Sequence, residues 1–233
     1  METLTYGDDP SQRVELTRPR GEAKGVVVVI HGGFWRSQYD LSLGRPLAKD
    51  LAAHGWLAAN IEYRRVGDGG GWPTTGDDVA RAIDAVGATP DVDTSTLLTL
   101  GHSAGGHLAT WVVGRTQETA VTGVVSQAGV LDLSAARSAG LGGGAVDALL
   151  GSGGDLRDAD PMSRIPLSVP VRCIHGRDDA NVPISQSKDY VAAATKAGAD
   201  ATLTEVDGDH FVLIDVRSDV WRRTRGLLDD LAA

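Results

Sequence analysis

Cysteine, positive charge and long apolar runs are all scarce in this chain of 233 residues, and each scarcity excludes something. Cys173 is the one cysteine, so the chain cannot form an internal disulfide. Its place in the apolar run 169–174 favours a buried, unreactive thiol over a nucleophile. No apolar run is long enough to cross a bilayer, and residues 1–6 have neither the basic nor the apolar region of a secretory signal. We therefore expect a cytoplasmic protein with no membrane partner.

Basic residues number 22 against 31 acidic ones, which gives a formal net charge of -9. A surface of this sign repels nucleic acids and anionic membranes, and no basic cluster offsets the repulsion. We expect no nucleic-acid partner, and a substrate that is small or neutral. Nothing in the sequence indicates an oligomeric state.

Metal and cofactor motifs are also missing from the sequence. The six histidines show no His-Glu-x-x-His or comparable ligand spacing, which predicts that no metal is bound. The glycine run 69–71 lacks the lysine and the preceding strand of a phosphate-binding loop. We therefore expect no cofactor.

What the chain does contain is a regular alternation of short β-branched runs and longer amphipathic stretches, with 42% hydrophobic residues overall. This alternation predicts one α/β domain over residues 1–233, with a mostly parallel sheet of about seven to eight strands flanked by helices. Strands are predicted at 13–16, 26–30, 57–62, 97–100, 121–126, 171–174 and 201–205. Helices are predicted at 42–53, 75–86, 104–114, 184–197 and 219–231.

Two glycine-rich stretches, 67–71 and 140–154, are predicted to be loops. The second has room for a small mobile cap, but the length of the chain excludes a large lid domain.

The strongest motif follows the apolar run 97–100 and reads Gly101-His102-Ser103-Ala104-Gly105. A Gly-x-Ser-x-Gly sequence between a strand and a helix is typical of a nucleophile elbow. Its glycines allow a sharp turn that places the Ser103 hydroxyl at the end of the strand, above the helix N-terminus. We predict that Ser103 attacks a carbonyl carbon.

A second glycine-rich motif, His31-Gly32-Gly33-Phe34-Trp35, follows the apolar run 26–30. Sites of open α/β sheets lie at the carboxyl ends of strands, so this loop is expected to lie beside Ser103. Its backbone N–H groups, together with that of Ala104, would form an oxyanion hole. His31 itself is predicted to hold the loop by hydrogen bonds and not to transfer protons.

The remaining catalytic residues are constrained by chain order, because in this type of site the acid and then the histidine follow the serine. Of the six histidines, only His210 fits, in a glycine-containing loop after the run 201–205. The acid is Asp178 or Asp179, which both follow the run 171–174. Their adjacency does not decide which one faces the imidazole.

The segment from His175 to Pro183 resembles the acid loop of α/β-hydrolases, whose terminal Val-Pro aligns with Val182 and Pro183 and places the acid at Asp179. In this alignment Asp178 is a solvated or loop-capping carboxylate. Nearly the whole chain resembles the α/β-hydrolase superfamily. Its two glycine motifs resemble those of the kynurenine formamidase and bacterial esterase branch, which carries His-Gly-Gly-x-Trp.

This resemblance implies a serine hydrolase of the carboxylesterase or arylformamidase type, with Ser103, Asp179 and His210 as its triad and an acyl-enzyme intermediate. It also implies that Gly33, Phe34 and Ala104 supply the oxyanion-hole N–H groups. The substrate would be a small ester or amide. Two alternatives are a small-peptide hydrolase and a non-hydrolytic enzyme or binding protein on the same scaffold.

Few aromatic residues are available to select the substrate. Five of them lie beside the catalytic loops, namely Phe34, Trp35, Tyr39, Trp72 and Phe211. Of these, Trp35, Trp72 and Phe211 are predicted to wall an apolar pocket, unless each of them only packs beneath its own loop. Arg64 and Arg65 are candidates for binding a substrate carboxylate, but ion pairs with Glu62, Asp77 or Asp78 are the favoured use.

Overall fold

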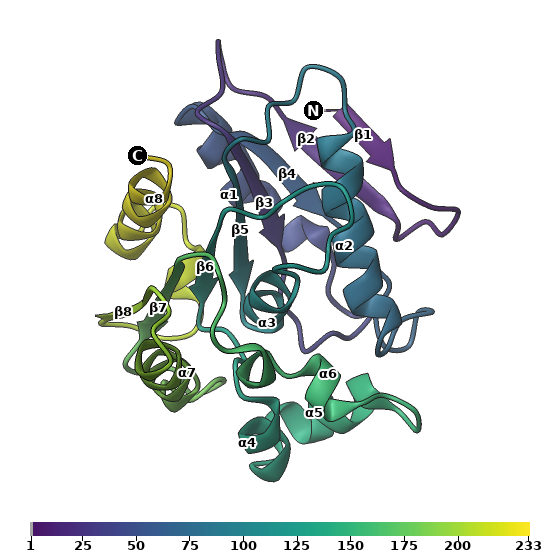
Figure 1. The fold of residues 1–233 in the computed structure, drawn as a ribbon, viewed down its shortest axis with the longest axis vertical. Coiled ribbons are helices and arrows are strands. Elements are labelled where there is room, and N and C mark those ends of the chain that lie inside the picture. Colours follow the sequence, from purple (N-terminus) through teal and green to yellow (C-terminus); the bar gives the residue numbers. More distant parts are fainter. Residues whose placement is uncertain (1) are drawn as a thin grey trace.

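Eight strands form a single sheet in the computed structural model, which describes residues 2–233 (Figure 1). Met1, the first residue of the predicted domain, lies outside the described residues. The strand order is β1-β2-β4-β3-β5-β6-β7-β8, in which β2 is antiparallel to both β1 and β4 and all other neighbours are parallel. The strands are β1 (Glu2–Thr5), β2 (Arg13–Thr17), β3 (Val26–Ile30), β4 (Leu57–Ile61), β5 (Leu97–His102), β6 (Gly123–Gln127), β7 (Val171–Gly176) and β8 (Ala201–Val206).

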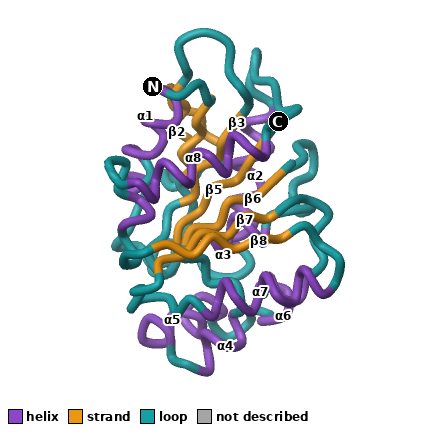
Figure 2. Tube along the Cα trace, turned by 90° about the vertical axis from the view of Figure 1, so that its left-hand side faces the viewer, coloured by secondary structure: helices purple, strands orange, loops and turns teal. Residues whose placement is uncertain are grey.

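Helices cover both faces of this sheet, and Figure 2 shows the strands running through the middle of the molecule. Side chains of α1 (Arg45–Ala53) and α8 (Asp219–Leu231) pack on one face. Those of α2 (Thr74–Gly87), α3 (Ala104–Trp111) and α7 (Ser185–Lys196) pack on the other. The remaining helices are α4 (Leu133–Ser138), α5 (Leu141–Leu150), α6 (Leu156–Ala159) and the short 3-10 turns η1 (Leu41–Leu43), η2 (Pro161–Arg164) and η3 (Val212–Ile214).

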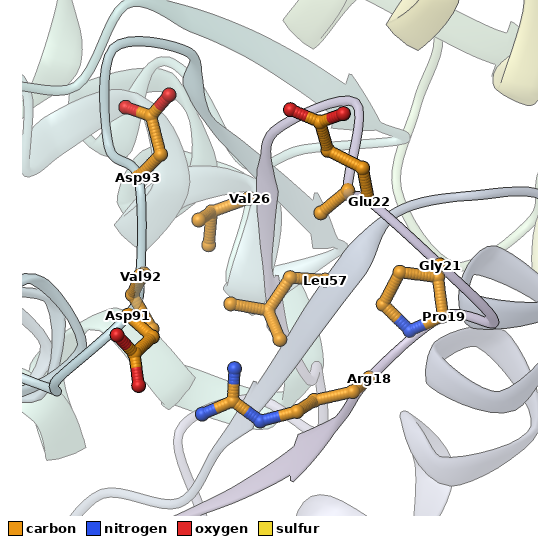
Figure 3. Close-up of a pocket in the computed structure, with 10 residues that line it drawn as sticks. Arg18, Pro19, Gly21, Glu22, Val26, Leu57, Asp91, Val92 and Asp93 are labelled. Carbon is orange, nitrogen blue, oxygen red and sulfur yellow. The ribbon is translucent and has the colours of Figure 1, made fainter.

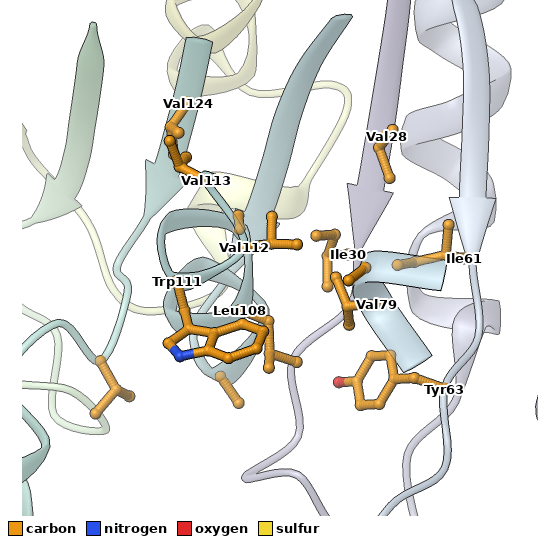
Figure 4. Close-up of a cluster of buried hydrophobic side chains, with 14 of the residues drawn as sticks. Val28, Ile30, Ile61, Tyr63, Val79, Leu108, Trp111, Val112, Val113 and Val124 are labelled. Atoms are coloured by element: carbon orange, nitrogen blue, oxygen red, sulfur yellow. The ribbon is translucent and has the colours of Figure 1, made fainter. Parts of the chain in front are cut away.

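Strand β3 explains why the core has two halves. All five of its residues are buried, because a central parallel strand is covered on both faces. Successive side chains point to opposite faces, so Val28 and Ile30 join the core under α2 and α3, while Val27 and Val29 join the core under α1 and α8. Figure 4 shows the first of these cores, in which aliphatic side chains of the sheet meet Leu108, Trp111 and Val112 of α3 and the following turn.

The predicted mostly parallel sheet flanked by helices is confirmed, and all seven predicted strands and all five predicted helices are present. Strand β1 was not predicted, because only Leu4 of its four residues packs on the core. The prediction that 140–154 is a loop is wrong, since α5 occupies most of it. In its first turn, Gly142, Gly143 and Gly144 have φ values of 60, 65 and 79°, a left-handed conformation that glycine adopts without penalty. Three successive glycines give no apolar periodicity, so the sequence pattern did not indicate this helix.

A cavity of about 340 Å³ lies at the amino ends of β3 and β4, beside their first residues (Figure 3). Val26 and Leu57 form its floor, and Arg18, Glu22 and Asp91 are among its polar walls. None of the predicted site residues lines this cavity. Open α/β sheets bind ligands at the carboxyl ends of their strands, and those ends carry the predicted catalytic motifs of this chain.

Candidate active site

Ser103 occupies the turn between β5 and α3, in a backbone conformation of φ 57° and ψ -120°. A non-glycine residue in such a conformation costs on the order of 1–3 kcal/mol and persists only where its surroundings enforce it. Gly101 and Gly105 are part of that enforcement. A Cβ atom at Gly101 would lie 2.0 Å from the carbonyl oxygen of Gly105, and one at Gly105 would lie 2.0 Å from that of Ile30. Larger residues at either position would therefore push the elbow away from the sheet.

Backbone hydrogen bonds fix Ser103 to the neighbouring strand. Its N–H donates to the carbonyl of Gln127 at 2.8 Å, and its own carbonyl accepts from the N–H of His107 at 3.2 Å. The residue is 3% exposed and lines a cavity of about 120 Å³ at the carboxyl ends of the strands.

The second glycine motif forms a loop against the same cavity. Gly33, Phe34 and Trp35 have φ values of 113, 53 and 57°, so the chain passes through three successive left-handed residues. The Trp35 carbonyl accepts from the N–H of Val66 at 2.8 Å. His31 is buried and hydrogen-bonds through Nδ1 to the Gly32 carbonyl at 2.8 Å and through Nε2 to Glu62 at 2.9 Å. The hydrogen bonds predicted for His31 are thus present.

Among the backbone N–H groups of this loop and of the elbow, those of Gly33, Phe34 and Ala104 have no acceptor within residues 2–233. Gly33 and Phe34 line the cavity with Ser103, and Ala104 is the first residue of α3. Unsatisfied donors at a helix N-terminus and in a left-handed loop create a positive potential suited to an anion.

His210 lines the same cavity and contacts Asp179 behind it. Nδ1 of His210 donates to Oδ2 of Asp179 at 2.6 Å, and the two side chains are 5% and 0% exposed. Since a carboxylate only accepts, the His210 proton lies on Nδ1 and Nε2 is the free, basic nitrogen. No hydrogen bond joins His210 to the Ser103 hydroxyl in the described chain. Catalytic hydrogen bonds of this kind are often long until substrate binds.

The environment of Asp179 keeps it ionised. Burial would raise the pKa of Asp179, but hydrogen bonds from His175, His210 and the Val182 N–H outweigh it and hold that pKa well below its usual value. Asp178, its neighbour, is exposed to solvent. The structure therefore places Asp179, and not Asp178, against the imidazole.

The structure corrects the prediction for two of the three aromatic residues. Trp35 is fully buried and donates from its indole to Nδ1 of His107 at 3.2 Å, while Trp72 is 7% exposed and donates to Asp158 at 3.0 Å. Neither lines the cavity, because both indoles fill the core beneath their loops. Phe211 does line it and is 57% exposed.

Sequence reasoning also missed several residues that line the cavity. They come from segments without a recognisable motif or, for His102, from inside one, and comprise Leu43, His102, Asn181 and Ile214. Tyr39, which the sequence places beside the catalytic loops, also lines the cavity. Arg64 forms its favoured ion pair with Asp78 at 2.7 Å, and Arg65 forms one with Glu62 at 3.0 Å.

Residues 2–233 contain no cluster of three or more metal-ligating side chains. None of their helices has the length and apolar character needed to span a membrane.

The buried histidines predict how stability responds to acid. Burial lowers the pKa of His102 to about 3 and that of His107 to about 4, from 6.5 in an exposed residue. Below pH 6.5 the unfolded chain therefore binds more protons than the folded one, so stability falls as pH falls. Between pH 7 and pH 5 we expect the free energy of unfolding to decrease by about 2 kcal/mol for each histidine, measured by urea denaturation.

The variant His107→Gln should lose its share of that decrease. His54, whose side chain is 44% exposed, provides the matched control, since His54→Gln should show the same decrease as the unchanged chain. Equal pH dependence in all three proteins would contradict the assignment.

Together, the mostly parallel sheet, the strained serine at the end of a central strand, and the histidine paired with a carboxylate at the same edge define an α/β-hydrolase. The chain belongs to the BD-FAE family, whose model matches residues 14–193.

Curated relatives include esterase LipC of Mycobacterium tuberculosis, which is 29% identical over 81% of this chain and 53% of its own length. A probable isoprenylcysteine alpha-carbonyl methylesterase of Oryza sativa is 26% identical over 89% of this chain and 57% of its own length. The chain thus spans about half the length of the curated relatives it matches.

Solved structures show the same fold over the full chain. Thermogutta terrifontis esterase 2 superposes with a TM-score of 0.82 and 23% identity, covering 98% of this chain and 92% of its own. A truncated carbohydrate esterase from gut microbiota superposes with a TM-score of 0.81 and 19% identity, covering 100% and 96%. The relatives named here are esterases, and the resemblance to kynurenine formamidases stays a prediction.

Proposed function

We propose that this protein hydrolyses carboxylic esters with a small acyl group, with Ser103 as nucleophile. One observation carries the proposal: a buried serine in a strained elbow shares a cavity with His210, whose Nδ1 lies 2.6 Å from the buried carboxylate of Asp179. A serine hydroxyl is a weak nucleophile, and an adjacent base oriented by a third group is what activates it.

In the proposed reaction, Nε2 of His210 accepts the Ser103 proton while the serine oxygen bonds to the carbonyl carbon. The resulting oxyanion accepts hydrogen bonds from the free N–H groups of Gly33, Phe34 and Ala104. Collapse of this intermediate breaks the ester C–O bond, and His210 returns the proton to the leaving alcohol. Water then attacks the acyl-enzyme with His210 again as base, which releases the acid and restores Ser103.

Asp179 has two parts in this sequence. It holds the imidazole with its proton on Nδ1, and it stabilises the imidazolium that forms when Nε2 takes the second proton. A carboxylate whose pKa is held well below its usual value keeps its charge throughout the working pH range.

The cavity favours a small, uncharged substrate. No Asp, Glu, Lys or Arg is among the residues that line its volume of about 120 Å³. Three large hydrophobic side chains are exposed in the described chain, and all three line this cavity: Tyr39, Leu43 and Phe211. Such an exposed apolar group beside polar catalytic atoms is typical of a binding site for an apolar ligand.

The alternative, hydrolysis of the formamide N-formylkynurenine, depends on the His-Gly-Gly-x-Trp motif. Trp35, which distinguishes this motif, is fully buried and hydrogen-bonded to His107, so it supports the loop and has no face free to stack on an aryl ring. The names of the relatives favour the ester. Phe34, Tyr39 and Phe211 are the Phe, Tyr or Trp side chains that line the cavity.

A substrate series tests this choice. We expect para-nitrophenyl acetate and butyrate to be cleaved with much higher kcat/KM than the palmitate ester, because a long chain does not fit so small a cavity. We also expect a kcat/KM for N-formylkynurenine at least about a hundredfold below that for the better short ester, a difference of about 2.7 kcal/mol in transition-state binding.

All substrates are compared at one pH and temperature with a single preparation of the enzyme. A formamide constant equal to or above the ester constants would replace the esterase proposal with a formamidase. Equal rates on acetate and palmitate would contradict the size limit.

A further inference from the structure

His102, the residue between Gly101 and Ser103, is absent from the reaction described above, although it lines the same cavity. It is 7% exposed. Its Nε2 lies 2.9 Å from the backbone carbonyl of His210, and the centroids of the two imidazole rings are 4.4 Å apart. The side chain that precedes the nucleophile therefore contacts the residue proposed as the base through both its backbone and its ring.

The chemistry of this contact fixes the protonation state of His102. Burial lowers the pKa of His102 to about 3, so the ring is neutral near pH 7 and carries one N–H. A carbonyl oxygen only accepts, so that proton lies on Nε2 and is donated to His210.

We propose that His102 is a positioning residue that fixes the loop of His210 relative to the elbow of Ser103. This inference rests on the proposed function. In the described chain, the His102 hydrogen bond is the one direct hydrogen bond between residues 101–106 and residues 207–214. Gln127 makes the other connection indirectly, since its carbonyl accepts from Ser103 and its side-chain amide donates to Leu213.

This connection matters because Ser103 and His210 lie in segments that are far apart in the sequence. Asp179 fixes the far side of the imidazole through Nδ1 but does not set its distance from the serine oxygen. A displacement of about 1 Å between reacting groups costs on the order of a hundredfold in rate. Anchoring the His210 backbone to the residue adjacent to Ser103 removes most of the freedom for such a displacement.

The neutrality of His102 is also required by its surroundings. The titratable groups that act on it are His210, His175 and Asp179. When His210 becomes an imidazolium during the reaction, a second positive ring 4.4 Å away would oppose the proton transfer. A neutral donor holds the loop without that repulsion.

Two variants with the same amide group and different reach test the proposal. His102→Gln places its Nε2 about where the imidazole Nε2 lies, so it retains a donor for the His210 carbonyl; His102→Asn places its amide near the imidazole Nδ1, too short to reach it. We expect the Asn variant to lose about 30- to 100-fold in kcat on para-nitrophenyl butyrate with KM within about threefold, and the Gln variant to stay within about fivefold in kcat.

Two further readouts do not require an ester substrate. One is the rate constant for labelling Ser103 with a fluorophosphonate, which should fall in parallel with kcat. The other is the low-field proton resonance of the His210 Nδ1–H, which the Gln variant should retain and the Asn variant should broaden or lose. Thermal unfolding midpoints of both variants are measured alongside.

Equal kcat, labelling rate and resonance in the Asn and Gln variants would overturn the positioning role, as would a loss confined to KM. If the unchanged chain hydrolyses no ester and is not labelled, the proposed function fails instead, and the His210 resonance still decides whether His102 holds the loop.

Discussion

Ser103→Ala is expected to lower kcat on para-nitrophenyl butyrate by on the order of 10⁴-fold or more. The variant removes the only atom that can form the acyl-enzyme, and Ala tolerates the strained backbone at this position no worse than Ser. What remains is the rate that the oxyanion-hole N–H groups and substrate binding supply to direct attack by water. Steady-state kinetics on enzyme purified free of contaminating esterases measures the loss.

Ser126 provides a matched control for this experiment. It is fully buried near the carboxyl end of the neighbouring strand β6, and its hydroxyl has no hydrogen-bond partner in the described chain. Ser126→Ala should keep kcat within about threefold, because it removes a buried hydroxyl that makes no bond. A fluorophosphonate should label the unchanged chain and the Ser126 variant stoichiometrically and leave the Ser103 variant unlabelled.

Retention of more than a tenth of the activity by the Ser103 variant would show that another group is the nucleophile. Absence of both labelling and hydrolysis in the unchanged chain would favour the alternative of a binding protein on this scaffold.

Asp179→Asn is expected to lower kcat by about 10³- to 10⁴-fold, while Asp178→Asn should cost less than about threefold. An Asn side chain offers an N–H to the imidazole as readily as an oxygen, which favours the tautomer with its proton on Nε2 and removes the base. It also withdraws the charge that stabilises the imidazolium. Asp178 is exposed and hydrogen-bonds to neither histidine of the site.

Asp179 also accepts backbone hydrogen bonds within its loop, so the folding of each variant must be measured together with its activity. Oδ1 of Asp179 accepts from the N–H groups of Asn181 and Val182, each at 2.8 Å, and the Asn oxygen can keep both bonds. Circular dichroism and the thermal midpoint should therefore change little. A larger loss at Asp178 than at Asp179 would show that the imidazole pairs with the other carboxylate.

The position of the proposed nucleophile is predictable from the sequence because its requirements are local. A strand, two glycines that must admit close backbone contacts, and a helix all lie within residues 97–111. The predicted base followed from chain order, which left His210 alone among six histidines. The predicted choice of Asp179 needed the resemblance to a known loop, because residue type and periodicity do not distinguish two adjacent carboxylates in a loop.

The sequence by itself determined the order of the seven strands β2–β8 and of the helices that flank them, the sheet class, and Ser103 and His210 as candidate catalytic residues, since these depend on residue type, periodicity and chain order. Only the tertiary structure decided which side chains form the cavity. Trp35 and Phe211 both neighbour predicted catalytic motifs, yet Trp35 is buried against His107 and Phe211 is exposed at the cavity. The packing partner that decides this lies 72 residues away for Trp35, and contacts between distant segments leave no periodic signal in either segment. For the same reason, the sequence did not predict the hydrogen bond between His102 and His210, which are 108 residues apart.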